Sequence, residues 1–166
     1  NRQKGLTFRW LLDHLRDGNG RAVPRSLMRL IEYAAHEELS QPKATGAHLL
    51  DHTSVRRELD KVSEEHVSQA KSSELPWLQG LADRLGRSRE VPWLRRELLT
   101  LLKRDFAESW SSNDQPLTPP GNDAEELLQS LLELGVVRAR PKDEFDVPDL
   151  YLHGLGLKRK GGVARK

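Results

Sequence analysis

The stretch from Asp17 to Leu30, DGNGRAVPRSLMRL, combines residue types that bind cations or phosphates. A calcium loop of the EF-hand type that began at Asp17 would need glycine at its sixth position and glutamate at its twelfth. Those positions hold Ala22 and Met28. A phosphate-binding P-loop needs Gly-Lys followed by Ser or Thr, and the chain contains no such tripeptide. We therefore expect this stretch mainly to end one helix and to begin the next.

Arg25 is the residue of this stretch with a possible chemical role of its own. Pro24 fits the first turn of a helix, because a backbone N–H would have no partner there, and this places Arg25 at the helix start. Backbone N–H groups and the helix dipole favour an anion at this end, and a guanidinium can hold a phosphate by two hydrogen bonds. Arg25 is therefore a candidate phosphate contact, and the alternative is an ordinary solvated arginine.

The histidines do not predict a metal site. His48 and His52 have the spacing of a zinc-binding helix, but Leu49 stands where the HExxH pattern requires glutamate. In the inverted pattern, HxxEH, Asp51 replaces the glutamate, and no third ligand lies nearby in the sequence. No serine has the glycine elbow of a hydrolase, so we predict no catalytic residue. Four further histidines are expected to be surface or cap residues: His14, His36, His66 and His153.

Helical spacing of apolar residues dominates the first half of the chain. It predicts a helix over residues 6–16, a second from Pro24 to about Leu39, and shorter helical pieces between His48 and Leu85, with Ser63 as an N-cap. Residues 1–86 are therefore predicted to form a helical, lid-like bundle. Three tryptophans are expected to pack in the core or between helices: Trp10, Trp77 and Trp93.

The second half predicts a different arrangement. Residues 92–110 are expected to form the longest helix, begun by the proline of VPWL, and residues 111–122 a proline-rich connection. Asn122 and Glu125 resemble a capping box that opens a helix through Leu134. Two short strands joined by residues 141–144 then form a hairpin. The order of helix, linker, helix and hairpin is the winged-helix pattern, so we predict a mainly α chain with a winged-helix domain over residues 87–157 and a basic tail over 158–166.

Composition limits the partners of the chain. Its 166 residues are 36% hydrophobic and 31% charged, with 27 basic and 25 acidic side chains, as in a soluble, helix-rich protein. The absence of cysteine excludes disulfides and fits a reducing cytosol. No apolar run approaches the roughly 20 residues that cross a bilayer, so we expect a cytoplasmic protein without membrane contact. Because the chain does not begin with methionine, we expect a piece of a longer protein.

Basic residues in the hairpin and the tail are candidates for contact with nucleic acid or another anion. The helix before the hairpin carries acidic residues and no lysine or arginine, so it would be repelled by DNA and is not expected to read a groove. The hairpin and tail could still touch a phosphate backbone without reading sequence, and the alternative is a solvated end. The candidates are Arg138, Arg140, Lys142, Lys158, Arg159 and Lys160.

Two segments, DGNGRAVPRSLMRLIEYA and LGVVRARPKDEFDVPDLYLHGLGLKRKGGV, resemble the C-terminal region of bacterial P-loop ATPases of the AAA+ or STAND type. Such enzymes have a nucleotide-binding core, a helical lid and a winged helix. The resemblance implies that Arg25 matches a lid arginine that senses the γ-phosphate of the nucleotide.

The P-loop, its lysine and the Walker B acid of those enzymes are absent from this chain. The resemblance therefore implies a non-catalytic regulatory module with no cofactor of its own, and ATP and Mg²⁺ would belong to the parent protein. The module would couple the nucleotide state of an upstream P-loop domain to a protein partner. The alternative is a winged-helix module that binds nucleic acid through the basic wing and tail.

Overall fold

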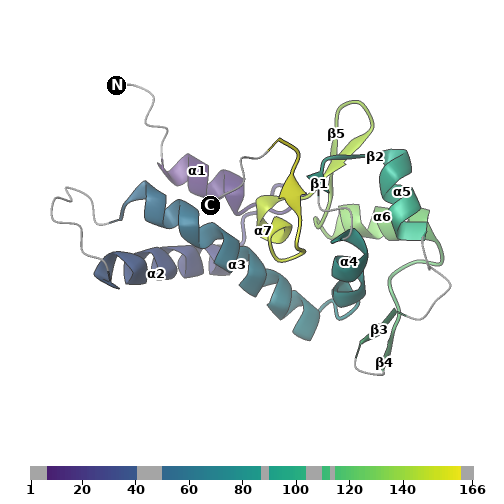
Figure 1. Ribbon diagram of the computed structural model, residues 1–166, viewed down its shortest axis with the longest axis horizontal. Helices are drawn as coiled ribbons and strands as arrows, with labels where there is room; N and C mark the ends of the chain where they lie inside the picture. The colour runs from purple at the N-terminus through teal and green to yellow at the C-terminus, as the bar shows by residue number, and fades with distance from the viewer. Residues whose placement is uncertain (1–6, 41–49, 87–89, 104–109, 113–114, 162–166) are drawn as a thin grey trace.

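The computed structural model describes residues 7–40, 50–86, 90–103, 110–112 and 115–161 (Figure 1). The chain is mainly helical, as predicted, with small two- and three-stranded sheets. Within the described residues, no helix is long and apolar enough to span a membrane. The helices are α1 (Thr7–His14), α2 (Pro24–Ser40), α3 (His52–Ser72), α4 (Leu78–Leu85), α5 (Arg95–Lys103), α6 (Ala124–Glu133) and α7 (Asp149–Leu152). The strands are β1 (Glu90–Val91), β2 (Trp93–Leu94), β3 (Trp110–Ser112), β4 (Gln115–Leu117), β5 (Arg138–Arg140), β6 (Glu144–Asp146) and β7 (Lys158–Arg159).

Helices α2 and α3 lie along each other and form the longer arm of the molecule in Figure 1. Helix α2 begins at Pro24, as its sequence predicts. Helix α3 is one continuous helix of 21 residues, where shorter pieces were predicted. Ser63 is not an N-cap but is fully buried within this helix. The N-cap is Asp51, whose carboxylate accepts a hydrogen bond from the Thr53 N–H at 2.8 Å.

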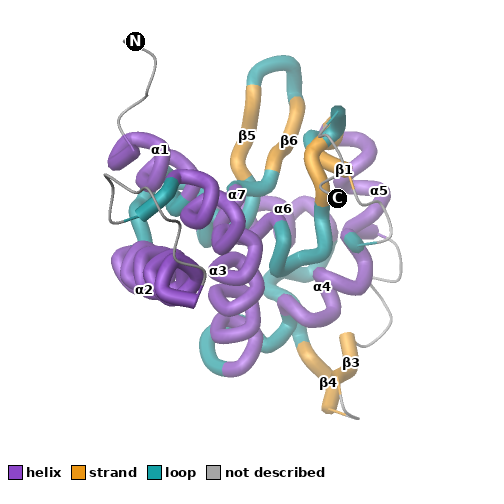
Figure 2. The backbone as a smooth tube through the Cα atoms, turned by 60° about the vertical axis from the view of Figure 1, so that its left-hand side comes forward, coloured by secondary structure: helices purple, strands orange, loops and turns teal. Residues whose placement is uncertain are grey.

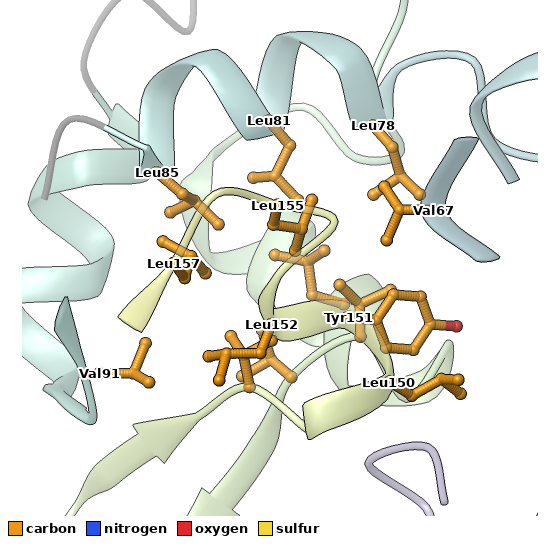
Figure 3. Packing of buried hydrophobic residues seen from close by; sticks show 14 of the residues in the cluster. Val67, Leu78, Leu81, Leu85, Val91, Leu150, Tyr151, Leu152, Leu155 and Leu157 are labelled. Atoms are coloured by element: carbon orange, nitrogen blue, oxygen red, sulfur yellow. The ribbon is translucent and has the colours of Figure 1, made fainter. Parts of the chain in front are cut away.

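Helix α7 packs against α3 at a contact that requires glycine. The Gly154 N–H donates to Ser63 Oγ at 3.0 Å. A Cβ atom on Gly154 would lie 2.5 Å from both the Ser63 carbonyl oxygen and Val67 Cγ2. Beyond α7, Leu155 and Leu157 face α4, as Figure 3 shows. The buried apolar residues from Leu15 to Leu157 form one hydrophobic cluster, which spans both predicted domains.

The hairpin of β5 and β6 forms as predicted and projects from the helices (Figure 2). Three residues, 141–143, connect the strands, because Arg140 lies opposite Glu144. Two of them, Lys142 and Asp143, have φ angles of 66° and 55°, in the left-handed region that non-glycine residues seldom adopt. Strand β2 adds to β6, so the antiparallel sheet has the order β2-β6-β5. Trp93 of β2 and Ala139 of β5 both lie opposite the buried Phe145 in this sheet.

The segment predicted as the longest helix differs from its prediction. The Val91–Pro92 peptide bond is cis, and Pro92 lies between β1, which pairs in parallel with β7, and β2. Helix α5 starts only at Arg95, and residues 104–109 lie outside the described residues. VPWL therefore forms strands rather than a proline-started helix. The β3–β4 pair begins at Trp110, which was predicted to end the helix, and continues into the proline-rich connection.

Helix α6 begins one residue later than predicted. Its N-cap is Asp123, which accepts hydrogen bonds from the N–H groups of Glu125 and Glu126. The Glu126 carboxylate accepts from the N–H of Asn122 at 2.7 Å, one residue before the N-cap, so the helix start differs from the reciprocal capping box predicted for Asn122 and Glu125. The exposed side of α6 carries Glu125, Glu126 and Glu133.

Candidate functional site

The loop from Asp17 to Arg21 acts as a connector. Asp17 Oδ1 accepts hydrogen bonds from the N–H groups of Asn19 and Arg21, at 2.9 and 2.8 Å. The loop also contacts the end of α6, because Asn19 Nδ2 donates to the Glu133 carbonyl at 2.8 Å and the Gly18 N–H donates to the Gly135 carbonyl at 2.6 Å. These polar groups fold the loop and fasten the start of α2 to the end of α6.

Arg25 lies at the start of α2, as predicted, and its side chain is exposed. Within the described residues it has no hydrogen bond and no ion pair. Beside it, between α2 and α3, is a small pocket with room for about one water molecule. The pocket is lined by Arg25, Ser26, Arg29, Val62, Glu65, His66 and Gln69.

Three polar lining residues of this pocket, Arg29, Glu65 and Gln69, already have partners in the fold. Tyr33 Oη donates to Glu65 Oε2 at 2.6 Å, and Gln69 Nε2 donates to Glu65 Oε1 at 2.9 Å. Arg29 Nε lies 3.2 Å from the same Oε1 atom, and Arg29 also pairs with Glu32 at 2.8 Å. The hydrogen bond to Glu65 raises the pKa of Tyr33, with burial and the Glu65 charge acting in the same direction. Glu65 is therefore a paired carboxylate.

His66, another lining residue of the pocket, has a buried polar atom that is unsatisfied. Its Nε2 is buried and has no hydrogen-bond partner within the described residues. The ring packs edge-to-face on Tyr151, with 4.9 Å between the centroids. Burial lowers the pKa of His66, although the charges of Glu74 and Asp17 act in the opposite direction. Burial also raises the pKa of Tyr151 to about 12.

The sequence-based prediction for His66, a surface or cap residue, is wrong. A usable signal was its spacing, because it follows Val62 by four positions and Leu59 by seven, both of which are buried on α3. Two other histidines form contacts with acids: His14 Nε2 lies 3.7 Å from an Asp149 oxygen, and His153 Nε2 lies 2.9 Å from an Asp60 oxygen.

The arginines of the predicted wing and tail lie around the carboxylate of Asp146. Its side chain is fully buried, and it accepts hydrogen bonds from Arg138 and Arg159 at 2.7 Å each. Arg140 lies 3.8 Å from the same carboxylate, and Arg159 also donates to Asp149 at 2.7 Å. Burial alone would raise the pKa of Asp146, but the hydrogen bonds from Arg138 and Arg159 outweigh it and hold the pKa below its usual value. Sequence reasoning gave Asp146 no role.

The other three basic candidates are lysines without an ion pair in the described part of the chain. Lys142 lies at the tip of the hairpin, and Lys158 and Lys160 are exposed on and just after β7. Lys160 also borders an open groove with Arg96 and Trp93. Of the six predicted anion-binding residues, the three arginines therefore lie near the buried Asp146, and the three lysines are exposed.

The pattern His48–His52 is only partly within the described residues, since His48 lies outside them. His52 is exposed and lies 3.2 Å from an oxygen of Asp51, the N-cap of α3. The described residues hold no group of three histidines or acids that could bind a metal ion.

Comparison with known proteins gives no relatives: no protein-family model, no curated protein and no solved structure matches this chain.

Proposed function

We propose that this chain is a regulatory and interaction module of a P-loop ATPase, composed of a helical lid-like part and a winged helix. It would be non-catalytic, and would couple the nucleotide state of an upstream domain to a protein partner. The observation that carries this proposal is Arg25, a cationic side chain without a partner in the described structure, beside a pocket at the start of α2.

The arrangement of the C-terminal half supports the winged-helix part of the proposal. Helix α4, strand β2 and helices α5 and α6 precede the β5–β6 hairpin, and β2 completes an antiparallel sheet with that hairpin. Helix α6 occupies the place before the hairpin where DNA-binding relatives of this pattern would need basic side chains. Because α6 instead exposes Glu125, Glu126 and Glu133, the partner that fits this face is a protein rather than DNA.

A physical link between Arg25 and α6 supports the coupling. Asn19 and Gly18 hydrogen-bond to the carbonyls at the end of α6, and the same loop leads into α2 at Pro24. A Cβ atom on Gly18 would lie 2.5 Å from the Val137 carbonyl oxygen, so the two segments are in close contact. A phosphate that moves the start of α2 would therefore displace the loop against α6. Such coupling requires that the nucleotide bind the two arrangements with different affinity.

The test is Arg25→Ala in the full-length protein. We expect its nucleotide response, measured as ATP affinity and turnover, to be lost, because the phosphate contact is removed. Arg9→Ala is the matched control, since Arg9 is an exposed arginine of α1 with no partner in the described part of the chain. Unchanged ATP affinity and turnover in the Arg25 variant would contradict the assignment.

Nucleic-acid binding is the second candidate function, and the three lysines without an ion pair support it. Deleting the whole tail would remove Arg159 and with it a partner of the buried Asp146, so a loss of binding could reflect loss of structure. Replacing Lys158 and Lys160 by alanine avoids this. If they contact phosphates, salt-dependent binding of duplex DNA weakens, and the slope of its salt dependence falls by about two. No binding at low salt would exclude this function.

A further inference from the structure

Helix α2 carries apolar side chains on two sides. Leu30 and Ala34 are fully buried on the side that packs on α3. Met28 and Leu39 are 67% and 78% exposed, and Ile31 is 39% exposed. At about 100° per residue, Met28 lies roughly opposite Leu30 on the helix, so the exposed side chains lie on the side away from α3. We call the apolar residues of this side the outer stripe: Pro24, Met28, Ile31, Ala35 and Leu39.

The outer stripe concentrates the exposed apolar surface of the chain. Of the four large apolar side chains that are exposed in the described residues, three belong to it, and the fourth is Leu134 at the end of α6. Single exposed apolar residues are normal, whereas a row of them on one surface is typical of a contact with another molecule. Figure 2 shows α2 at the edge of the molecule with α3 on one side, so a second molecule can reach the outer stripe.

The charges of α2 are divided along its length. Residues 24–31 contain Arg25 and Arg29 and no acid, whereas residues 32–40 contain three glutamates and no lysine or arginine. The helix dipole adds positive charge at the first end and negative charge at the second. Arg29 also pairs with Glu32 of its own helix, and Arg25 has no ion pair in the described residues. A second copy of α2 is therefore attracted when it runs antiparallel and repelled when it runs parallel.

The spacing of the outer stripe also fits a second copy of the same helix. In an antiparallel pair that crosses just after Ile31, Met28 of one copy lies opposite Ala35 of the other. Pro24 in the same way lies opposite Leu39, and the two copies of Ile31 meet near the centre. A large side chain then faces a smaller one at each contact, which allows close packing. Both copies use the same surface, as in a dimer with two-fold symmetry.

We infer that this chain associates with a second copy of itself through the outer stripes of two antiparallel α2 helices. The pair removes the exposed apolar side chains from water and places the basic half of each α2 beside the acidic half of the other. A single pair of helices is a smaller contact than the standard protein interface of about 1,600 Å². The association is therefore weak and depends on the concentration of the chain.

Sedimentation of this chain over a range of concentrations measures the association. We expect a monomer–dimer equilibrium that Ile31→Glu weakens about tenfold or more, because the variant buries a carboxylate in an apolar contact. Leu134→Glu is the matched control, since Leu134 has the same exposure of 39% but lies outside α2, and it should leave the equilibrium unchanged. A chain that stays monomeric up to about 1 mM, the limit of weak binding, overturns the inference. Equal weakening by both variants also overturns it.

Single cysteines test the orientation of the two helices, because the chain has no cysteine of its own. A mixture of Met28→Cys and Ala35→Cys chains should form a mixed disulfide, since these positions face each other in the antiparallel pair. Leu39→Cys should not cross-link to its own copy, because a rise of 1.5 Å per residue separates the two positions by about 22 Å, beyond the reach of a disulfide. Efficient cross-linking of Leu39→Cys to itself, or failure to form the mixed disulfide, would contradict the antiparallel pair.

A different occupant of the outer stripe would give a different set of results. If this chain stays monomeric while Ile31→Glu, but not Leu134→Glu, removes the nucleotide response of the full-length protein, the outer stripe contacts the upstream domain. That result overturns the self-association and leaves the proposed function standing. A dimer with the expected cross-links, together with a normal nucleotide response of Arg25→Ala, supports the self-association and contradicts the proposed function.

Discussion

Two charged regions of this molecule are built in opposite ways. Around Asp146, a buried carboxylate accepts hydrogen bonds from Arg138 and Arg159, so the charges meet inside the fold. Around the pocket between α2 and α3, two lining residues, Arg25 and His66, have polar side-chain atoms without a hydrogen-bond partner in the described structure. The arginines of the first region hold the fold together, whereas Arg25 in the second is exposed and His66 Nε2 is buried without a hydrogen bond.

This difference changes how the basic residues of the chain are interpreted. Arg138, Arg140 and Arg159 look like surface cations in the sequence, but each lies near one buried acid. The sequence places Arg25 at a helix start, but it does not show that Arg25 lacks an acidic partner that these three have. What separates them is the presence or absence of a nearby carboxylate in the folded chain. Counting lysines and arginines therefore does not identify a binding surface here.

The largest effect is expected for Asp146→Asn. The substitution removes the charge that Arg138 and Arg159 share, and breaking a buried ion pair by removing one partner typically destabilises strongly. Because the Arg138 and Arg159 guanidiniums are partly exposed, we expect a loss of about 3 kcal/mol of unfolding free energy, at the lower end of the losses typical for such pairs. Urea unfolding of the variant and the wild type measures this loss of unfolding free energy. The control is Asp143→Asn at the exposed hairpin turn, where asparagine accepts the positive φ. An equally small loss in both variants would contradict the contrast between the regions.

A smaller effect of opposite sign is expected for His66→Phe. Phenylalanine keeps the ring shape and removes the buried nitrogen, so at pH 7 stability should be unchanged or higher by up to about 1 kcal/mol. Because burial lowers the pKa of His66 below its usual 6.5, the unfolded chain binds the proton more readily than the folded chain. The wild type should therefore lose stability relative to the variant as the pH falls below about 6.5.

Unfolding curves of both proteins between pH 5 and pH 8 measure this difference. A stability difference that is independent of pH would show that His66 titrates alike in the folded and unfolded chains. A large loss of stability in His66→Phe at pH 7 would show that the nitrogen serves the fold and would remove the contrast with Asp146.

The smallest effect is expected for Arg25→Ala, whose unfolding free energy should lie within about 0.5 kcal/mol of the wild type, as for surface positions without special contacts. The side chain is exposed and has no partner in the described residues. The comparison is Arg159→Ala, which removes a partner of both Asp146 and Asp149 and should lower the denaturant midpoint clearly more. Equal losses in the two variants would mean that Arg25 also serves the fold.

Elements with strong local signals could be predicted from the sequence. The start of α2 at Pro24, the β5–β6 hairpin and the helix before it were predicted from proline, turn and capping residues, and the structure confirms them. The position of Arg25 at a helix start follows from the same local signal. Its role as a phosphate contact stays a prediction, and so do the domain boundaries.

Features that depend on distant segments could not be predicted in this way. The tetrapeptides LPWL (75–78) and VPWL (91–94) are nearly the same. Helix α4 begins at Leu78 of the first, whereas the second forms β1 and β2 because β7 and β6 pair with it. The surroundings of His66 include Tyr151 of α7, which lies far along the chain. The role of Asp146 depends on β7, which brings Arg159 to it. In each case the deciding partner is remote in sequence.

The contact between the Asp17–Arg21 loop and α6 has a consequence for how the chain is made. Asn19 and Glu133 are separated by 114 positions, and Ser63 and Gly154 by 91. During synthesis the first half of the chain leaves the ribosome well before these partners exist. Helix α3 can pack on α2 at once, but the part of α3 that contacts α7 must wait for α7 to be translated, and contacts of such long sequence separation form slowly. Until then, the apolar residues of α3 that α7 covers are exposed in the nascent chain, and such surface is prone to aggregation.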